Sequence, residues 1–254
     1  MADTATWIRT VRSSHDRFAG LLRPLTQAEV VGPSYAAEWS IADTASHLGS
    51  QAEIFGLFLD AGLAGRPAPG GEVFPPIWER WNALPPIEQV RQSVDVNEAF
   101  VSRVEQTPDE QRDRFSLAAF GTDLDLGGLM AMRLGELALH TWDIAVALDA
   151  TATVSADAVD LLIDQLPVTA ARTGKASTGA KPVGLVTTDP ARTFVLDVGD
   201  AVTLQPSPEP GADPLLLPAE GLVRLVYGRL DADHTPAGVD EARLADLRPV
   251  FPGF

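Results

Sequence analysis

Apolar residues recur every three or four positions along much of the first 150 residues, and this spacing predicts amphipathic α-helices. The first predicted helix covers residues 4–22, and Pro24, two residues later, prevents it from continuing. The second runs from Ser40 to about Gly62, with Ser40 as N-cap and Asp43 favouring the positive end of the helix. His47 lies inside this helix, beside its apolar stripe.

Two more helices are predicted over residues 86–106 and 126–148. The connections between them are a Gly/Pro-rich loop at 65–76 and, after the charged segment near Pro108, a loop over 115–125. Four long helices joined by connections of variable length predict an up-and-down bundle over residues 1–150.

The remaining residues show a different pattern. A helix predicted over 155–171 should be kinked or shortened by Pro167, and it forms part of a bridging helix and linker at 151–175. Alternating, β-rich runs then predict strands at 183–188, 193–198 and 201–205, followed by short helices at 218–227 and 240–247. Residues 176–254 are therefore expected to form a small α+β domain.

The helix predicted at 126–148 carries four ionisable side chains, Arg133, Glu136, His140 and Asp143. At about 100° per residue, these four fall within an arc of roughly 80°. The rest of the helix surface is apolar or small, which is typical of a buried helix. Burying such a charged stripe is costly unless its members are paired, hydrogen-bonded or bound to a metal.

A metal site is the first interpretation of this stripe. Glu136 and His140 stand four residues apart, so both side chains can reach one point. His47 could join them from the second helix, because inward side chains from facing helices build metal sites in four-helix bundles. Two histidines and one carboxylate suit zinc, and also Fe(II), Mn, Co or Ni.

A structural interpretation of the same residues is open. A Glu–His pair at this spacing is common on solvated helix faces, and Arg133 and Asp143 could instead form a ladder of buried ion pairs. His47 taken alone fits an ordinary core or surface histidine. His15 and His234 have no comparable setting and are interpreted as surface residues.

Composition narrows the class of function. The net charge of −16 argues against a nucleic-acid surface, because phosphate binding needs clustered Lys and Arg. The chain has no cysteine, which excludes disulfides, thiolate metal sites and an internal thiol nucleophile. The N-terminal residues lack the apolar core of a signal peptide, and no apolar run has the length of a membrane span. A soluble, cytoplasmic protein without a membrane partner is expected.

Two motifs carry a resemblance to a known family. Residues 39–48 (WSIADTASHL) resemble the W-s-x-x-d-x-x-x-H-l signature of DinB-like metal-binding bundles. Residues 133–143 (RLGELALHTWD) resemble the E-x-x-x-H-x-W-D signature of the mycothiol-dependent maleylpyruvate isomerase family. The segments 227–229 and 251–253 resemble that family's second domain, a small α+β module related to sterol carrier proteins. The resemblance thus spans nearly the whole chain.

The resemblance implies roles for individual residues. His47, Glu136 and His140 match the three metal ligands, with zinc as the expected metal. Asp143 matches the motif's aspartate, which would orient a ligand or pair with Arg133. Arg229 would face the cleft between the domains and hold a substrate carboxylate, although an ordinary helix-terminal arginine explains it equally well. Arg133 is the second candidate for a cationic group at the substrate or cofactor, although pairing with a carboxylate of the stripe suits a buried charge better.

The resemblance also implies a chemistry that suits a chain without cysteine. Family members take their thiol from mycothiol, whose thiolate the metal would stabilise. Addition of that thiolate to maleylpyruvate, bond rotation and elimination give the trans isomer, whereas an S-transferase stops after addition or displacement. The expected function is therefore a metalloenzyme of one of these two kinds, acting on a small anionic or electrophilic substrate. The alternative is a metal-binding bundle with a thiol-independent or non-catalytic, regulatory role. The sequence specifies neither the substrate nor the oligomeric state.

Overall fold

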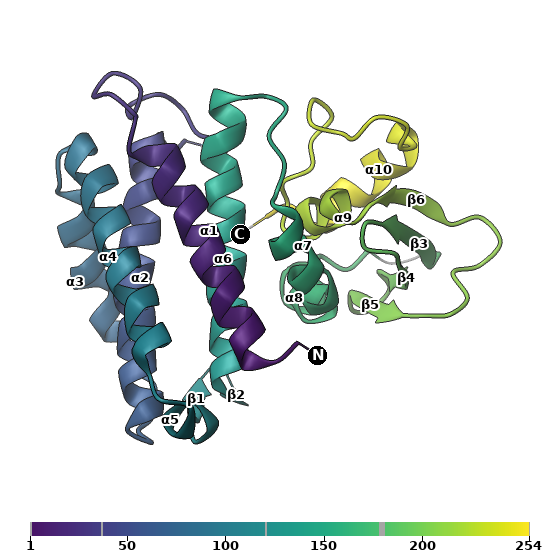
Figure 1. Cartoon of the computed structure of the whole chain (residues 1–254). Helices are drawn as coiled ribbons and strands as arrows, with labels where there is room; N and C mark the ends of the chain where they lie inside the picture. Colours follow the sequence, from purple (N-terminus) through teal and green to yellow (C-terminus); the bar gives the residue numbers. More distant parts are fainter. Residues whose placement is uncertain (1, 37, 120, 178–180, 254) are drawn as a thin grey trace. The chain divides into compact units, whose positions relative to one another are not determined.

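The computed structural model describes residues 2–36, 38–119, 121–177 and 181–253. The chain divides into two compact units, Met1–Thr153 and Val154–Phe254, each with its own core (Figure 1). The segment 151–175, interpreted from the sequence as a bridge and linker, lies almost wholly in the second unit, because its helices pack on elements of that unit.

Four long helices build the first unit, and the sequence pattern predicted each of them to within one residue at either end. They are α1 (Thr4–Leu22), α2 (Ile41–Leu63), α4 (Pro86–Gln106) and α6 (Leu126–Leu148). Side-chain caps explain three of the sharp starts. Asp3 caps α1 and Asp125 caps α6, and Ser40 and Asp43 form a reciprocal capping box at the start of α2.

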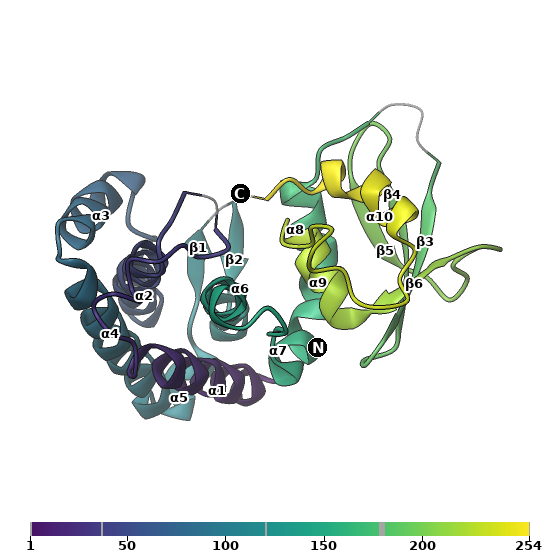
Figure 2. The ribbon, with the colours of Figure 1, turned by 90° about the horizontal axis from the view of Figure 1, so that it is seen from above.

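The order of these helices differs from the up-and-down bundle expected from the sequence. Helix α1 packs against α4 and α6, and α2 packs against the same two helices, so α1 and α2 stand diagonally opposite each other (Figure 2). Helices α2 and α4 run in the same direction, because Leu48 contacts Asn97 and, further along both helices, Asp60 pairs with Arg103. The up-and-down prediction is therefore wrong.

The connection between α2 and α4 explains this difference. Residues beyond Leu63 include a 3-10 turn, η1 (Gly71–Val73), and a short helix, α3 (Phe74–Asn82), which packs against α2 and returns the chain to the end where α2 began. The sequence predicted only a loop at 65–76, because prolines usually interrupt helices. Here the prolines occupy the first turn of α3, where a missing N–H has no cost.

The loop expected between α4 and α6 also contains structure. A short helix, α5 (Asp109–Asp113), is followed by a hairpin of β1 (Leu117–Ala119) and β2 (Thr122–Leu124), with Leu117 paired to Leu124. Leu117 is fully buried, so the hairpin closes the end of the bundle from which α6 starts.

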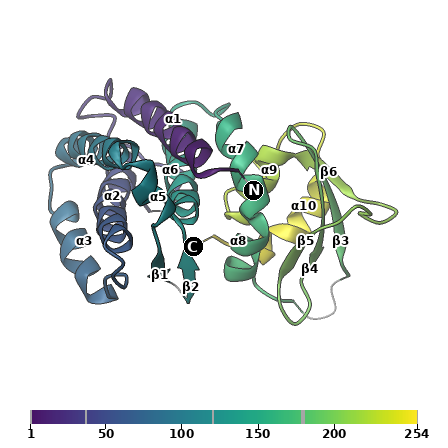
Figure 3. The same ribbon diagram turned by 60° about the horizontal axis from the view of Figure 1, so that its bottom comes forward.

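The second unit is a four-stranded sheet packed with helices (Figure 3). The strand order is β5-β4-β3-β6, with β3 antiparallel to β4 and parallel to β6. Its elements are α7 (Ala156–Leu162), η2 (Ile163–Gln165), α8 (Leu166–Thr173), β3 (Val183–Thr188), β4 (Arg192–Asp197), β5 (Thr203–Pro206), β6 (Leu215–Pro218), α9 (Ala219–Val226), α10 (Glu241–Leu247) and η3 (Arg248–Val250). The small α+β arrangement is as predicted, apart from β6, which the pattern did not indicate.

Pro167 divides the predicted helix at 155–171 as expected. Helix α7 gives way to η2, and α8 begins with Pro167 in its first turn. Helices α8 and α9 both contact the sheet, α8 at β5 and α9 at β3 and β6. Across the described residues of both units, no helix has the length and apolar character needed to cross a bilayer.

Close packing between α2 and α3 yields a test of the bundle. A Cβ added at Gly49 would lie 2.3 Å from the ring of Trp81, which is buried and hydrogen-bonded through its indole N–H to Glu53. We expect Gly49→Ala to lower the free energy of unfolding by about 1–3 kcal/mol through overpacking. Urea unfolding followed by circular dichroism measures it.

The matched control is Gly56→Ala in the same helix, where an added Cβ meets no atom within 4 Å. We expect this change to raise stability by about 0.5–1 kcal/mol, because alanine favours helix more than glycine. Equal stabilities of the two variants would contradict the packing of α3 on α2.

Candidate metal centre

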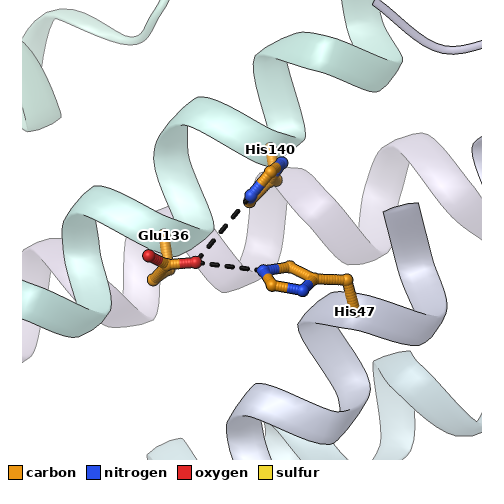
Figure 4. A group of neighbouring side chains, drawn as sticks. All are labelled: His47, Glu136 and His140. Carbon is orange, nitrogen blue, oxygen red and sulfur yellow. Dashed lines mark hydrogen bonds and ion pairs between the residues drawn. The ribbon is translucent and has the colours of Figure 1, made fainter. Parts of the chain in front are cut away.

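Two adjacent antiparallel helices bring three donor side chains together. His47 comes from α2, and Glu136 and His140 come from successive turns of α6 (Figure 4). One oxygen of Glu136, Oε2, lies 3.1 Å from His47 Nε2 and 3.8 Å from His140 Nε2. One ligand atom from each residue lies within 4.8 Å of the other two. The structure therefore joins the three residues that the sequence singled out.

Asp143 determines how His140 is oriented. Its carboxylate is completely buried and lies 2.7 Å from His140 Nδ1. A ring nitrogen that donates its proton to a carboxylate leaves the other nitrogen as an acceptor. His140 Nε2 is therefore the nitrogen available on the side of Glu136.

Glu136 is ionised at neutral pH. Burial raises the pKa of its carboxyl group, but the hydrogen bond with His47 and the electrostatic interactions with His140, His47 and Arg133 outweigh burial and lower the pKa to about 2. The side chains of His47 and Glu136 are 23% and 37% exposed, so a ligand from solution can reach this cluster.

Arg133 supports the cluster from the interior of the bundle. Its side chain is fully buried, and Nη2 donates to the Leu48 carbonyl at 3.2 Å and to the Asn97 side chain. The guanidinium carbon lies 5.5 Å from the centre of the Phe55 ring. Burial lowers the pKa of Arg133 to about 10, an effect that the charge of Glu136 opposes, so the guanidinium keeps its charge at neutral pH.

The expected ion pair between Arg133 and a carboxylate of the stripe is absent among the residues that the structure describes. Arg133 Nε and Nη1 have no hydrogen-bond partner there. Helix geometry explains why Asp143 is not the partner, because ten residues separate the two side chains by roughly 15 Å along the axis. The ladder of ion pairs is therefore the wrong interpretation. Asp143 instead pairs with Nδ1 of His140.

The donors fit a divalent transition metal. Donor atoms bound to one tetrahedral zinc ion at about 2.0–2.1 Å would lie roughly 3.3–3.4 Å apart. The separations of 3.1 and 3.8 Å from Glu136 Oε2 bracket that value. Two imidazoles and one carboxylate match the preferences of zinc and related ions, and the fixed Nδ1 of His140 is the usual support of a ligating histidine.

Two residues of the first unit were not interpreted correctly from the sequence. Trp39 received no role there, yet its ring lies against both His47 and His140. The sequence signal for Trp39 was its position just before Ser40, the N-cap of the helix that carries His47. His15 was expected on the surface but is 1% exposed, with Nε2 3.0 Å from Glu98, because this face of α1 packs on α4.

His15, Asp16 and Glu98 form a second group of possible metal ligands. In this group Glu98 is paired with an arginine instead. Arg12 donates two hydrogen bonds to Glu98, at 2.6 and 3.0 Å, and this pairing lowers the pKa of Glu98 to about 2. The other histidine interpreted as a surface residue, His234, is only partly exposed and lies 2.7 Å from Asp231 through Nδ1.

Arg229 belongs to the second unit, just beyond α9. Its Nη1 donates to the carbonyl of Tyr227 at 2.9 Å, and its backbone N–H donates to the carbonyl of Arg224 at 2.7 Å. Gly228, between Tyr227 and Arg229, has a φ of 71°. A Cβ added to it would lie 2.2 Å from the backbone of Gly253. The two segments quoted for the second domain therefore touch each other.

The buried guanidinium makes a stability prediction. Arg133→Ala would open a cavity and leave the side-chain oxygen of Asn97 without its donor. We expect a loss of about 2–5 kcal/mol in the free energy of unfolding. The control is Arg91→Ala, which removes an exposed pair with Glu88 on α4 and should cost no more than about 1 kcal/mol. Urea unfolding distinguishes them, and equal small losses would show that Arg133 does not support the bundle.

Comparison with known proteins identifies a matching family model and solved structures of similar fold. The family model described as the mycothiol maleylpyruvate isomerase N-terminal domain matches residues 11–145. The fold is similar to the crystal structures of a mycothiol-dependent maleylpyruvate isomerase and of its H52A mutant, each with a TM-score of 0.67, 16% identity and 90% of both chains covered. YfiT from Bacillus subtilis, described as a probable metal-dependent hydrolase, matches at a TM-score of 0.42 and 13% identity, over 58% of this chain and 90% of its own.

No curated protein matches the sequence. The family model alone spans more than half of the 254 residues, from the middle of α1 to near the end of α6, and includes all three donors of the cluster. The chain therefore belongs to the family defined by the mycothiol maleylpyruvate isomerase N-terminal domain.

Proposed function

We propose that this protein is a metal-dependent enzyme that uses mycothiol to isomerise a small, unsaturated, anionic substrate of the maleylpyruvate type. The observation that carries the proposal is the convergence of His47, Glu136 and His140 in a member of this family. The absence of cysteine agrees with it, because the reacting sulfur then has to come from outside the chain.

His47, Glu136 and His140 would hold the metal, with zinc as the expected ion. When bound, such an ion lowers the pKa of a thiol that contacts it, which provides a thiolate nucleophile for addition to an activated double bond. Glu136 contributes a full negative charge to the site, because its pKa of about 2 leaves it ionised at neutral pH. Asp143 accepts the Nδ1 proton of His140 in a hydrogen bond and thereby keeps Nε2 unprotonated and able to bind the metal.

The substrate's negative charge needs a local counterpart. A chain with a net charge of −16 repels anions in general, so a fixed cation has to offset this repulsion where the substrate binds. We assign this role to Arg229, whose planar guanidinium can hold a carboxylate through two hydrogen bonds. Arg133 is fully buried, and we assign it to support of the ligand helix rather than to contact with mycothiol.

Metal content tests the centre of the proposal. Wild type purified without chelator should contain about one equivalent of a divalent metal, and His140→Ala far less, because a two-donor site retains metal poorly. The control His234→Ala removes a histidine of the second unit and should keep the wild-type content. Near-zero metal in all three proteins, measured by plasma mass spectrometry, would refute the proposal.

Turnover tests the assignment of Arg229. We expect Arg229→Ala to keep its metal content and fold but to reduce kcat/KM with maleylpyruvate and mycothiol by about 10²-fold or more, the scale of one lost charged contact. The control Arg243→Ala removes another partly exposed arginine of the second unit, paired with Asp213, and should turn over normally. Full activity of Arg229→Ala would contradict the assignment.

The same assay separates the other functions of this scaffold. Accumulation of a thioether would indicate an S-transferase. A wild-type protein that holds metal but is inactive with mycothiol and a panel of electrophiles would favour the thiol-independent or regulatory role.

A further inference from the structure

A single indole ring lies against both histidines of the candidate metal centre. The ring centroid of Trp39 is 5.2 Å from that of His47 and 6.0 Å from that of His140, with which it is stacked at 24° between planes. The two imidazoles are 4.7 Å apart and approach edge to face. Trp39 thus contacts one donor from α2 and one from α6 at the same time.

Trp39 is held in place by its backbone. Its carbonyl accepts hydrogen bonds from the N–H and the hydroxyl of Ser34, at 2.9 and 3.1 Å. Its own N–H donates to the carbonyl of Ala36 at 3.1 Å. The hydroxyl of Thr44 on α2 donates to Ser34 Oγ at 2.9 Å, which ties this turn to the helix that carries His47.

The same turn is also tied to α6. The N–H of Tyr35 donates to the carbonyl of Asp143 at 2.9 Å, and Asp143 is the residue whose carboxylate orients His140. The ring of Tyr35 packs edge-on against Trp142, with centroids 4.7 Å apart. Glu38, immediately before Trp39, has a φ of 66°, a left-handed conformation that is unfavourable for a residue with a Cβ. The described residues of this turn are thus hydrogen-bonded to both helices.

An aromatic ring in this position has two physical effects. It covers one side of both imidazoles and keeps water away from that side, and it restricts rotation of the two rings about their side-chain bonds. Trp39 is itself 37% exposed, so burial in the core does not account for its position. Partners that orient metal ligands in this way raise metal affinity although they never touch the ion.

We propose that Trp39 is a positioning residue that holds the rings of His47 and His140 in register for one divalent metal and slows the escape of that metal. This inference rests on the proposed function only in requiring that the wild-type protein binds a metal. It adds a residue that acts through the two histidines and makes no bond to metal, thiol or substrate.

The test measures metal release and metal geometry directly. Zinc-loaded protein is mixed with an excess of a chromogenic chelator, and the dissociation rate is followed by absorbance. We expect Trp39→Ala to release zinc about 10-fold faster or more, and Trp39→Phe, which retains a ring, to stay within about threefold of wild type. The visible spectrum of the Co²⁺-substituted protein should shift for Trp39→Ala and remain unchanged for Trp39→Phe.

Two further variants make the result specific. Trp78→Ala removes a tryptophan of similar exposure, 40%, from α3 and should release zinc at the wild-type rate. Trp39→Leu keeps apolar bulk without a ring and should resemble Trp39→Ala, and this variant decides the question if the alanine variant does not fold. Wild-type release rates and Co²⁺ spectra in the leucine and alanine variants would overturn the role of Trp39 alone. A wild-type protein that binds no metal would overturn this inference together with the proposed function.

Discussion

The structure depends on the burial of most of one charged stripe inside a helical bundle. Helix α6 carries Arg133, Glu136, His140 and Asp143 on one side and is otherwise apolar, so most of its surface is covered. Each charge needs a partner, because an isolated ion in a protein interior is strongly unfavourable. Those partners come from α2, from α4 and from α6 itself, and the arrangement of the bundle is what brings them there.

The parallel course of α2 and α4 brings some of these partners to α6. Asn97 of α4 donates to the Leu48 carbonyl of α2 and accepts from Arg133 of α6, so one amide connects three helices. Because His47 is the residue next to Leu48, this contact also fixes the level at which His47 faces Glu136. The guanidinium thus lies behind the donor cluster, where it favours the ionised carboxylate. The same contacts of Asn97 and Arg133 therefore stabilise the bundle and position His47 opposite Glu136.

Two oppositely charged residues of α6 have different effects on the donor side chains. Asp143 is anionic and sets the direction of His140, whereas Arg133 is cationic and lowers the pKa of Glu136. The cluster retains partial exposure at His47 and Glu136, so it combines rigid support with access from solution. This combination suits the proposed binding of a metal and a thiol from solution.

Local sequence patterns predicted the long helices, the change to alternating strands and the pairing of Glu136 with His140, whereas His47 joined these two only through its motif. Local rules are sufficient for these features: helical spacing, the capping box at Ser40 and the four-residue separation of Glu136 and His140. The partner of Arg133, the burial of His15, the direction of α4 and the place of Trp39 followed from packing between the helices and could not be predicted. Each of these depends on contacts between residues far apart in the chain, such as Arg133 with Leu48 and Trp39 with His140, and the period of a single helix carries no information about which neighbour it meets.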